Sequence, residues 1–126
     1  MANKCILVID DEVGIHTVAQ IGLTLETDWK VLTALSGAEG VEIALKQQPD
    51  AILLDAMMPQ QGGIETLKIL RASPRTRDIP IIFFTAKVQA AHRREFYRLG
   101  AKGIISKPFD PTTLASQISG FLGWQE

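Results

Sequence analysis

Short apolar runs alternate with longer segments whose apolar residues recur every three or four positions, and this alternation repeats five times. Apolar, β-branched runs bounded by turn signals are typical of buried strands, and the longer spacing predicts amphipathic helices. The expected strands cover residues 5–9, 29–34, 51–55, 80–84 and 103–106. Strands that alternate with helices through short loops predict a parallel sheet with helices on both faces, joined by right-handed crossovers.

The expected helices have recognisable beginnings and ends. Ser36 and Glu39 have the spacing of a capping box at the start of the second helix. The fourth helix, at about 88–99, ends before Gly100, and the fifth begins at Asp110-Pro111, because glycine suits the residue after a helix and proline its first position. The first helix, at about 13–26, should bury an apolar face made of Ile15, Val18, Ile21 or Gly22, and Leu25.

Composition narrows the class of protein. A chain of 126 residues suits one domain, and we expect that domain to span 1–126, with a core at about 4–122. A net charge of −1 and a pI near 6.1 favour neither direct nucleic-acid binding nor a membrane surface. Cys5 is the single cysteine, which excludes an internal disulfide and fits a reducing, cytoplasmic compartment. No apolar run approaches the roughly 20 residues that a membrane span needs.

Polar side chains stand where the expected strands end. The carboxyl ends of parallel strands meet at one edge of a sheet, which is where open α/β sheets bind ligands. We therefore expect three carboxylates, a hydroxyl and an ammonium to converge at that edge. These groups belong to Asp10 and Asp11 after the first strand, Asp55 at the end of the third, Thr85 after the fourth and Lys107 after the fifth.

The three carboxylates need a counter-charge. Close carboxylates raise one another's pKa unless a cation lies between them, and Lys107 supplies only part of the neutralising charge. A divalent cation would supply the rest, and Mg²⁺ is usually held by one or two carboxylates, water and a phosphate. Because nitrogen and sulfur ligands are scarce near these residues, we do not expect a zinc site.

In this order the motifs resemble the receiver domain of two-component response regulators, and the chain is similar to the stand-alone chemotaxis receivers. Each motif alone has low specificity, but the ordered set is highly specific. The resemblance covers about 4–122 and implies five parallel strands in the flavodoxin-like order 2-1-3-4-5. The matching motifs are Asp10-Asp11, Asp55 followed by Met58-Pro59 and Gly63, Thr85-Ala86, and Lys107-Pro108-Phe109.

The resemblance implies a phosphorylation site and a metal site. Asp55 is expected to accept a phosphoryl group from a histidine of a sensor kinase or phosphotransfer protein. Asp11 and Asp55 are expected to bind Mg²⁺ directly, and Asp10 largely through water. Met57 stands where the family supplies a backbone carbonyl to the metal. We expect no enzymatic turnover beyond phosphoryl acceptance and autodephosphorylation.

The resemblance also implies a switch. Thr85 and Lys107 are expected to contact the phosphoryl oxygens, and Lys107–Pro108 to be a cis peptide bond. Their movement would alter the face formed by residues 88–122, through which the domain would bind a downstream protein or a second copy of itself. Ile104 stands where many receivers have an aromatic residue that rotates during this change, so that form of coupling is not expected. Met57 and Lys87 stand where the family tunes dephosphorylation, and Met57 is expected to screen the acyl phosphate from water.

Three other functions remain open on the sequence. A phosphatase of the haloacid dehalogenase type would also use an aspartate nucleophile, but it carries a second aspartate where this chain has Met57. A binding module independent of phosphorylation would not require the complete set of acids and lysine. A flavodoxin would share the fold, but the acidic loop after the first strand would repel a phosphate that lacks a metal.

Several further residues have simpler explanations. His16 and His92 are expected to be surface residues, and Cys5 an inert core thiol. Trp124 is either packed against the domain or available to a partner, and the sequence does not favour one. The remaining pattern is a basic strip on the fourth helix, which is either a solvated face or a partner-binding patch, made of His92, Arg93, Arg94 and Arg98.

Overall fold

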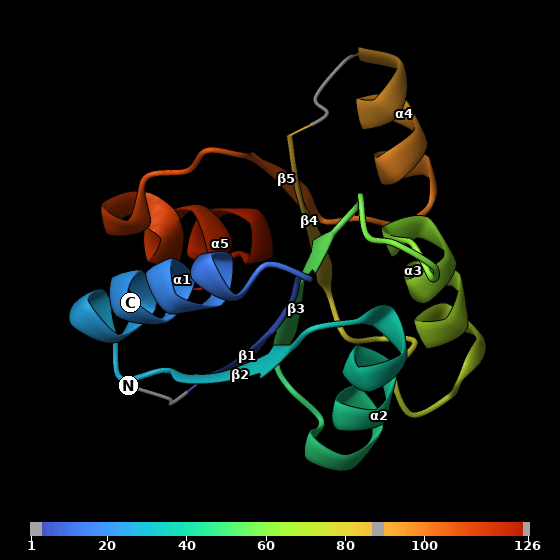
Figure 1. Cartoon of the computed structure of the whole chain (residues 1–126), viewed down its shortest axis with the longest axis horizontal. Coiled ribbons are helices and arrows are strands. Elements are labelled where there is room, and N and C mark those ends of the chain that lie inside the picture. Colours follow the sequence, from blue (N-terminus) through green and yellow to red (C-terminus); the bar gives the residue numbers. More distant parts are fainter. Residues whose placement is uncertain (1–3, 87–89, 125–126) are drawn as a thin grey trace.

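The computed structural model describes residues 4–86 and 90–124 (Figure 1). The expected alternation of strands and helices is confirmed, and each strand begins and ends within one residue of its expected bounds. The predicted start of the fourth helix at residue 88 lies outside the described residues. The elements are β1 (Cys5–Ile9), α1 (Val13–Glu26), β2 (Lys30–Ala34), α2 (Gly37–Gln47), β3 (Ala51–Asp55), α3 (Gly63–Ala72), β4 (Ile81–Thr85), α4 (Ala90–Arg98), β5 (Gly103–Ser106), the 3₁₀ turn η1 (Pro111–Thr113) and α5 (Leu114–Leu122).

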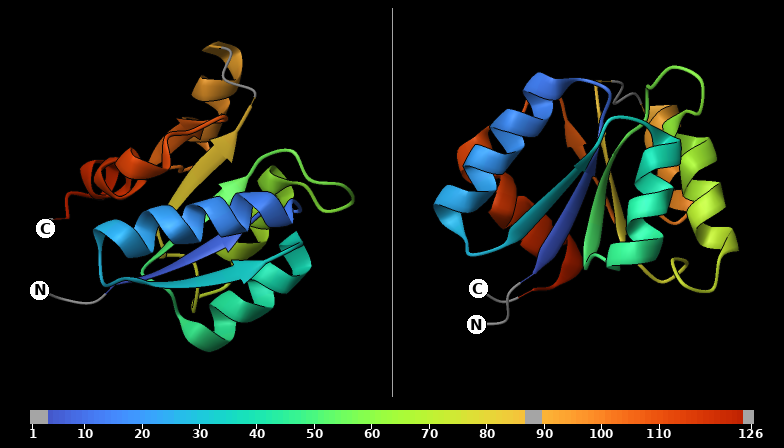
Figure 2. Two further views of the ribbon diagram at one scale, coloured as in Figure 1. Left: turned by 60° about the vertical axis from the view of Figure 1, so that its left-hand side comes forward. Right: turned by 60° about the horizontal axis from the view of Figure 1, so that its bottom comes forward.

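The sheet has the order that the resemblance implied. Its five strands are parallel and run β2-β1-β3-β4-β5. Helices α1 and α5 cover one face, and α2, α3 and α4 cover the other (Figure 2). Successive residues of β4 alternate between the two faces: Ile81 and Phe83 pack toward α3 and α4, and Ile82 and Phe84 pack toward α1 and α5.

The inward face of α1 differs from the expectation. The helix buries His16, Ala19, Gly22 and Leu23, so the prediction that His16 is a surface residue is wrong. Close packing against η1 selects this face, because a Cβ at Gly22 would lie 2.5 Å from the carbonyl oxygen of Pro111. Of the expected residues, Gly22 is buried and Ile15 packs partly buried against the core. The others face solvent, with exposed fractions of 39% for Val18, 52% for Ile21 and 77% for Leu25.

The helix ends mostly follow their sequence signals. Glu39 donates its backbone N–H to Ser36 Oγ over 3.1 Å, and its carboxylate accepts the N–H of Leu35 rather than that of Ser36. Asp110 Oδ1 accepts the N–H of Thr112 over 2.9 Å. Gly100 follows α4 with a φ of +105°, a conformation that favours glycine.

The choice left open for Trp124 is settled for the described residues. Its ring packs edge-on against Trp29 at a centroid distance of 5.4 Å, and the ammonium of Lys4 lies 4.6 Å from its ring centroid. Both contacts are inside the domain. No helix in the described part of the chain is long and apolar enough to cross a membrane.

Candidate functional site

The three predicted carboxylates meet at the carboxyl edge of the sheet. Ile9 of β1 lies opposite Leu54 of β3, so the residues that follow them, Asp10 and Asp55, are neighbours. One carboxylate oxygen from each of Asp10, Asp11 and Asp55 lies within 4.8 Å of the other two. Asp10 and Asp55 are 0% and 3% exposed, whereas Asp11 is exposed. The pocket therefore opens to solvent on the Asp11 side.

Lys107 brings the predicted ammonium into this pocket. Its Nζ lies 2.7 Å from Asp10 Oδ2, 3.4 Å from Asp55 Oδ2 and 3.7 Å from Glu12 Oε1. Its backbone N–H donates to the Thr85 carbonyl over 2.9 Å, which fixes the lysine at the end of β5. The Lys107–Pro108 peptide bond is cis, as the resemblance implied.

The electrostatics of the pocket follow from burial and from these contacts. Burial raises the pKa of Asp55, the Met57 N–H lowers it, the charge of Asp10 raises it and Lys107 lowers it, and the net effect is an increase. Burial alone would lower the pKa of Lys107, but its hydrogen bonds and charge interactions with Asp10 and Asp55 raise that pKa overall. Lys107 therefore stays protonated while Asp55 is poorly stabilised as an anion.

Thr85 is the last residue of β4, is fully buried, and lies opposite Ser106 of β5. Thr85 directly follows Phe84 in β4, and Phe84 lies opposite Asp55 of β3 in the sheet. Thr85 therefore lies at the carboxyl end of the strand next to the one that carries Asp55. All five predicted side-chain groups come from the carboxyl ends of β1, β3, β4 and β5.

Three further residues belong to the pocket: Glu12 and Phe84 were not predicted, and Phe109 was named only as part of a matching motif, without a role. Glu12 is the third acidic neighbour of Lys107. The Lys107 ammonium lies 5.3 Å from the ring centroid of Phe84, and the Phe109 ring packs edge-on against Phe84 at 4.7 Å. The signals available were the third acid of the run 10–12 and the aromatic residues adjoining Thr85 and Pro108, but neither signal specifies a contact with the lysine.

The loop after β3 forms the rim of the pocket. Met57 donates its backbone N–H to Asp55 Oδ1 over 3.0 Å, and its side chain is 55% exposed. The loop returns closely to β3 at Gly63, where a Cβ would lie 2.4 Å from the Asp55 carbonyl oxygen. Lys87, the other residue expected to tune dephosphorylation, lies outside the described residues.

The donor set of the pocket suits a hard divalent cation. The three carboxylates provide only oxygen ligands, and magnesium prefers such ligands together with water. In the described residues this is the one group of three or more acidic, histidine or cysteine side chains whose atoms lie close enough to share an ion. Asp10, Asp11 and Asp55 could therefore hold a cation beside the Lys107 ammonium.

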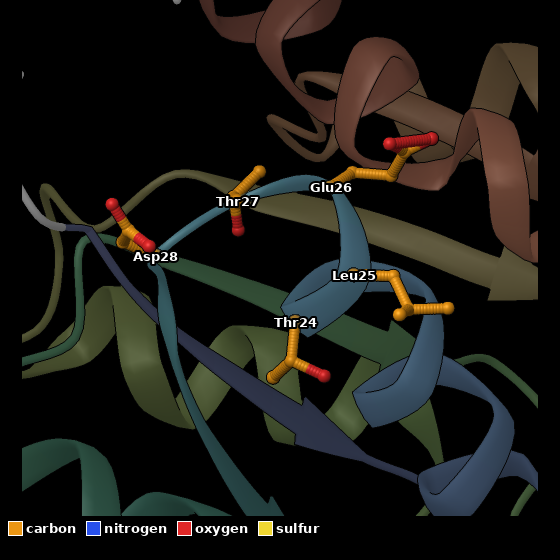
Figure 3. Close-up of a pocket in the computed structure, with 5 residues that line it drawn as sticks. All are labelled: Thr24, Leu25, Glu26, Thr27 and Asp28. Carbon is orange, nitrogen blue, oxygen red and sulfur yellow. The ribbon is translucent and has the colours of Figure 1, made fainter.

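A separate hollow of about 220 Å³ lies at the far end of α1, lined by the consecutive residues 24–28 (Figure 3). The side chains of these residues point away from one another around the turn. The hydroxyls of Thr24 and Thr27 already donate to the carbonyls of Gln20 and Leu23. The polar groups of the hollow therefore do not converge on a common point, and the acidic pocket is the better candidate site.

The chain matches the family model described as the response regulator receiver domain over residues 6–119. It is 37% identical over 120 residues to the alkaline phosphatase synthesis transcriptional regulatory protein PhoP of Bacillus subtilis, covering 95% of this chain and 49% of that protein. It is 34% identical over 122 residues to the phosphate regulon transcriptional regulatory protein PhoB of Pseudomonas aeruginosa, covering 97% of this chain and 53% of that protein.

Solved structures agree with these relatives. The chemotaxis protein CheY4 of Vibrio cholerae has a TM-score of 0.88 and 29% identity, covering 95% of this chain and 99% of that one. The chain spans about half the length of the curated relatives named above. From its sequence and its fold, this chain belongs to the response regulator receiver domains, which serve two-component signal transduction.

Proposed function

We propose that this receiver domain accepts a phosphoryl group on Asp55 from a phosphorylated histidine of a sensor kinase or phosphotransfer protein. A carboxylate oxygen of Asp55 attacks phosphorus, the bond between phosphorus and the imidazole nitrogen breaks, and the imidazole leaves with the electron pair. The product is an acyl phosphate, which water later hydrolyses. The observation that carries this proposal is the position of the Lys107 ammonium, 3.4 Å from the buried Asp55 carboxylate and 2.7 Å from that of Asp10.

Each group in the pocket has a task in this transfer. We propose that Lys107 pairs with the incoming phosphoryl oxygens and that Thr85 donates a hydrogen bond that orients them. Asp10, Asp11 and Asp55, with the backbone carbonyl of Met57, would hold Mg²⁺. When bound, the ion supplies positive charge that offsets the carboxylates and the phosphoryl oxygens.

A direct test uses a small phosphodonor. Incubation with acetyl phosphate and Mg²⁺, followed by intact mass measurement, should show one added phosphate that Asp55→Asn abolishes. Asp28→Asn is the matched control, because Asp28 is an exposed aspartate in the hollow at the far end of α1. Phosphate on the Asp55→Asn protein would contradict the assignment, and turnover of a generic phosphate ester would support the phosphatase instead.

The exposed apolar stripe of α1, made of Val18, Ile21 and Leu25, is proposed to hold the donor protein. Its spacing of three and four residues is that of a helix-packing seam. The helix begins at Val13, directly after Glu12, which contacts Lys107, so the stripe extends from the rim of the pocket. A helix carrying the phosphohistidine could pack here and present its imidazole to Asp55.

This docking proposal predicts that a substitution in the stripe affects phosphoryl transfer from a protein donor but not from a small phosphodonor. Ile21→Asp should slow phosphoryl transfer from a phosphorylated histidine phosphotransfer domain, because the charge disrupts the apolar contact. The same substitution should leave phosphorylation by acetyl phosphate unchanged, since Ile21 is 52% exposed and lies about two helical turns beyond the start of α1 at Val13. Equal rates with the protein donor would contradict the proposed docking surface.

The output is proposed to pass through the face formed by residues 88–122, where Tyr97 and Phe121 are 45% and 37% exposed. Ile104 is already buried, at 7% exposure, and lies opposite Phe83 in the sheet. Phe83 stacks on Phe96 of α4 with a centroid distance of 4.4 Å. We propose that these stacked rings connect Thr85 to α4 in place of the rotating aromatic residue.

The stacked rings can be tested without altering the pocket. Phe96→Leu should leave phosphorylation of Asp55 intact but reduce the phosphorylation-dependent chemical-shift changes of the α4 amides. Tyr97→Leu, on the exposed side of the same helix, is the control. If the Phe96 variant responds as the wild type does, the rings do not transmit the change. The downstream partner is proposed to be a protein or a second copy of the chain, with no direct contact to nucleic acid by this domain.

A further inference from the structure

Charge is unevenly distributed along this chain. Residues 68–102 contain nine of the 13 lysines and arginines but only two of the 14 acidic residues. Every arginine of the chain lies between residues 71 and 98. The near-neutral total therefore conceals a strongly basic segment, which covers the end of α3, the loop that follows it, and α4.

Arg71 joins the two parts of this segment in space. Its guanidinium donates to the carbonyl of Arg77 over 2.7 Å, to that of Ile79 over 3.0 Å and to that of Gly100 over 3.1 Å. The N–H of Lys102 donates to the carbonyl of Ile81 over 2.8 Å. The loop after α3 and the end of α4 are thereby held together, on the side of the sheet that α3 and α4 share (Figure 2).

Lys87 lies outside the described residues, and the basic side chains of this segment other than Arg71 are exposed. On α4, Arg93, Arg94 and Arg98 surround Tyr97 on the side opposite the buried Phe96. Arg98 pairs with Glu95, whereas Arg93 and Arg94 have no ion pair within the described residues. We call the exposed set that follows α3 the basic face, made of Arg75, Arg77, Arg93, Arg94, Arg98 and Lys102.

We propose that the basic face binds an acidic segment of a partner protein, with Tyr97 contacting an apolar side chain of that segment. The inference deepens the output half of the proposed function, because α4 belongs to both surfaces. Arginine presents a planar fork of donors that matches a carboxylate in two-point contact. Unpaired arginines around an exposed tyrosine have the composition of a protein-binding site, since both residue types are enriched at interfaces and among their dominant contacts.

Charge and composition indicate that the partner bound by the basic face is a protein and not a nucleic acid. Twelve of the 14 acidic residues lie outside residues 68–102, so the field of the whole domain does not attract an extended polyanion. Nucleic-acid-binding domains usually have a strongly basic total charge, whereas this chain has a net charge of −1. A short acidic peptide can contact the basic face without approaching the acidic pocket.

The test uses a fluorescein-labelled peptide of aspartate and glutamate that contains one phenylalanine, with binding followed by anisotropy at about 150 mM salt, where distant charges are screened. Arg93→Glu with Arg94→Glu should weaken binding by about tenfold or more, because two attractive charges become repulsive. Lys30→Glu with Lys46→Glu makes the same change in net charge at exposed positions on β2 and α2, and should alter binding by less than about twofold.

Three further measurements complete the test. Tyr97→Ala should weaken the phenylalanine peptide but leave an otherwise identical alanine peptide unchanged. All variants should still gain one phosphate from acetyl phosphate, so loss of peptide binding is separable from failure of the phosphoryl site. The proposal is overturned if the peptide does not bind, if both charge-reversal pairs weaken it equally, or if duplex DNA or phosphatidylserine vesicles bind the basic face more tightly than the peptide.

Discussion

Replacing Asp55 with asparagine should stabilise the metal-free protein, although the proposed function depends on this aspartate. The carboxylate is almost fully buried and lies within 4.8 Å of the nearest oxygens of Asp10 and Asp11. Asparagine has nearly the same shape, and its side-chain oxygen can still accept the N–H of Met57, which lies 3.0 Å from Asp55 Oδ1. The substitution therefore removes a charge while keeping the local hydrogen bond.

The magnitude follows from the distances. Two like charges at 4.8 Å repel by about 3.5 kcal/mol at an effective dielectric constant of about 20. Attraction to Lys107 at 3.4 Å returns about 5 kcal/mol on the same scale. Asp55 faces two acids, of which exposed Asp11 is partly screened, and it also bears the cost of burial. We expect asparagine to stabilise the protein by about 1–2 kcal/mol, a rise in melting temperature of roughly 3–10 °C.

The assay is thermal unfolding of both proteins, first in EDTA and then with Mg²⁺. A ligand at ten times its dissociation constant stabilises the folded state by about 1.4 kcal/mol. Wild type should gain this stabilisation and the variant less of it, so their melting temperatures should converge as Mg²⁺ is added. Asp28→Asn, which removes an exposed carboxylate, should respond to Mg²⁺ as wild type does.

The pH dependence has a definite sign. Burial raises the pKa of folded Asp55 above its unfolded value, so the folded state binds this proton more tightly than the unfolded state. The wild-type protein therefore loses stability as pH rises through the folded pKa, and the advantage of the variant should shrink toward acidic pH. A variant that is less stable in EDTA, or that gains as much from Mg²⁺ as wild type, would refute the assigned electrostatics.

Other substitutions have matched partners within the chain. Arg71→Met should lower the free energy of unfolding in urea by about 2–4 kcal/mol because it removes the hydrogen bonds to three carbonyls, whereas Arg75→Met should change it by less than about 0.5 kcal/mol. Gly63→Ala should lower the melting temperature and slow phosphorylation by acetyl phosphate, because its Cβ would lie 2.4 Å from the Asp55 carbonyl oxygen. Gly120→Ala, with no atom within 4 Å of its Cβ, should stabilise α5 by roughly 0.5–1 kcal/mol. Met57→Asn should shorten the half-life of phospho-Asp55 in a chase measured by intact mass, and an unchanged or longer half-life would reject the screening role of Met57.

The elements were predictable because local rules and tertiary structure agree in this chain. Short apolar runs became strands, of which the three central ones, β1, β3 and β4, are buried on both faces, as parallel strands usually are. The strand order could not be predicted in the same way. Alternation of strands and helices specifies a parallel sheet but not which strands are neighbours, and the correct order came from the resemblance. Local periodicity contains no term for contacts between distant segments, so it cannot choose among the possible orders.

The first helix shows where periodicity misleads. Residues 13–25 of α1 contain apolar side chains on both faces and no lysine, arginine, aspartate or glutamate. The face of α1 that is buried is the one on which Gly22 packs closely against η1. Small residues such as Gly22 contribute little to a hydrophobic pattern, so the pattern did not identify this face. The face with the larger side chains, Val18, Ile21 and Leu25, remained outside. An apolar face left exposed in this way is a reason to look for a partner.

The pocket was predictable at the level of residues but not of contacts. Parallel topology sends the ends of β1, β3, β4 and β5 to one edge, so polar residues at those ends must be close. Whether Lys107 approaches Asp10 or Asp55 more closely depends on side-chain packing over Phe84 and Phe109, and that packing is invisible in the sequence. Glu12 was missed for a different reason: residues at the start of a helix are commonly acidic without belonging to a site.

Burial makes the charged Asp55 carboxylate destabilising, and it also makes the free energy of this residue sensitive to ligands that bind in the pocket. A carboxylate in water would gain little from a nearby cation, because solvent already neutralises its field. Asp55 lies at the end of a fully buried strand, so Lys107, a divalent cation and an incoming phosphoryl group each change its free energy substantially. The apolar core that surrounds β3 can bear a local cost of 1–2 kcal/mol, about the effect of one ordinary substitution. Stability lost at this residue is therefore available as a driving force when ligands neutralise the pocket, and a fully solvated aspartate at the same edge could not couple its phosphorylation to the rest of the fold.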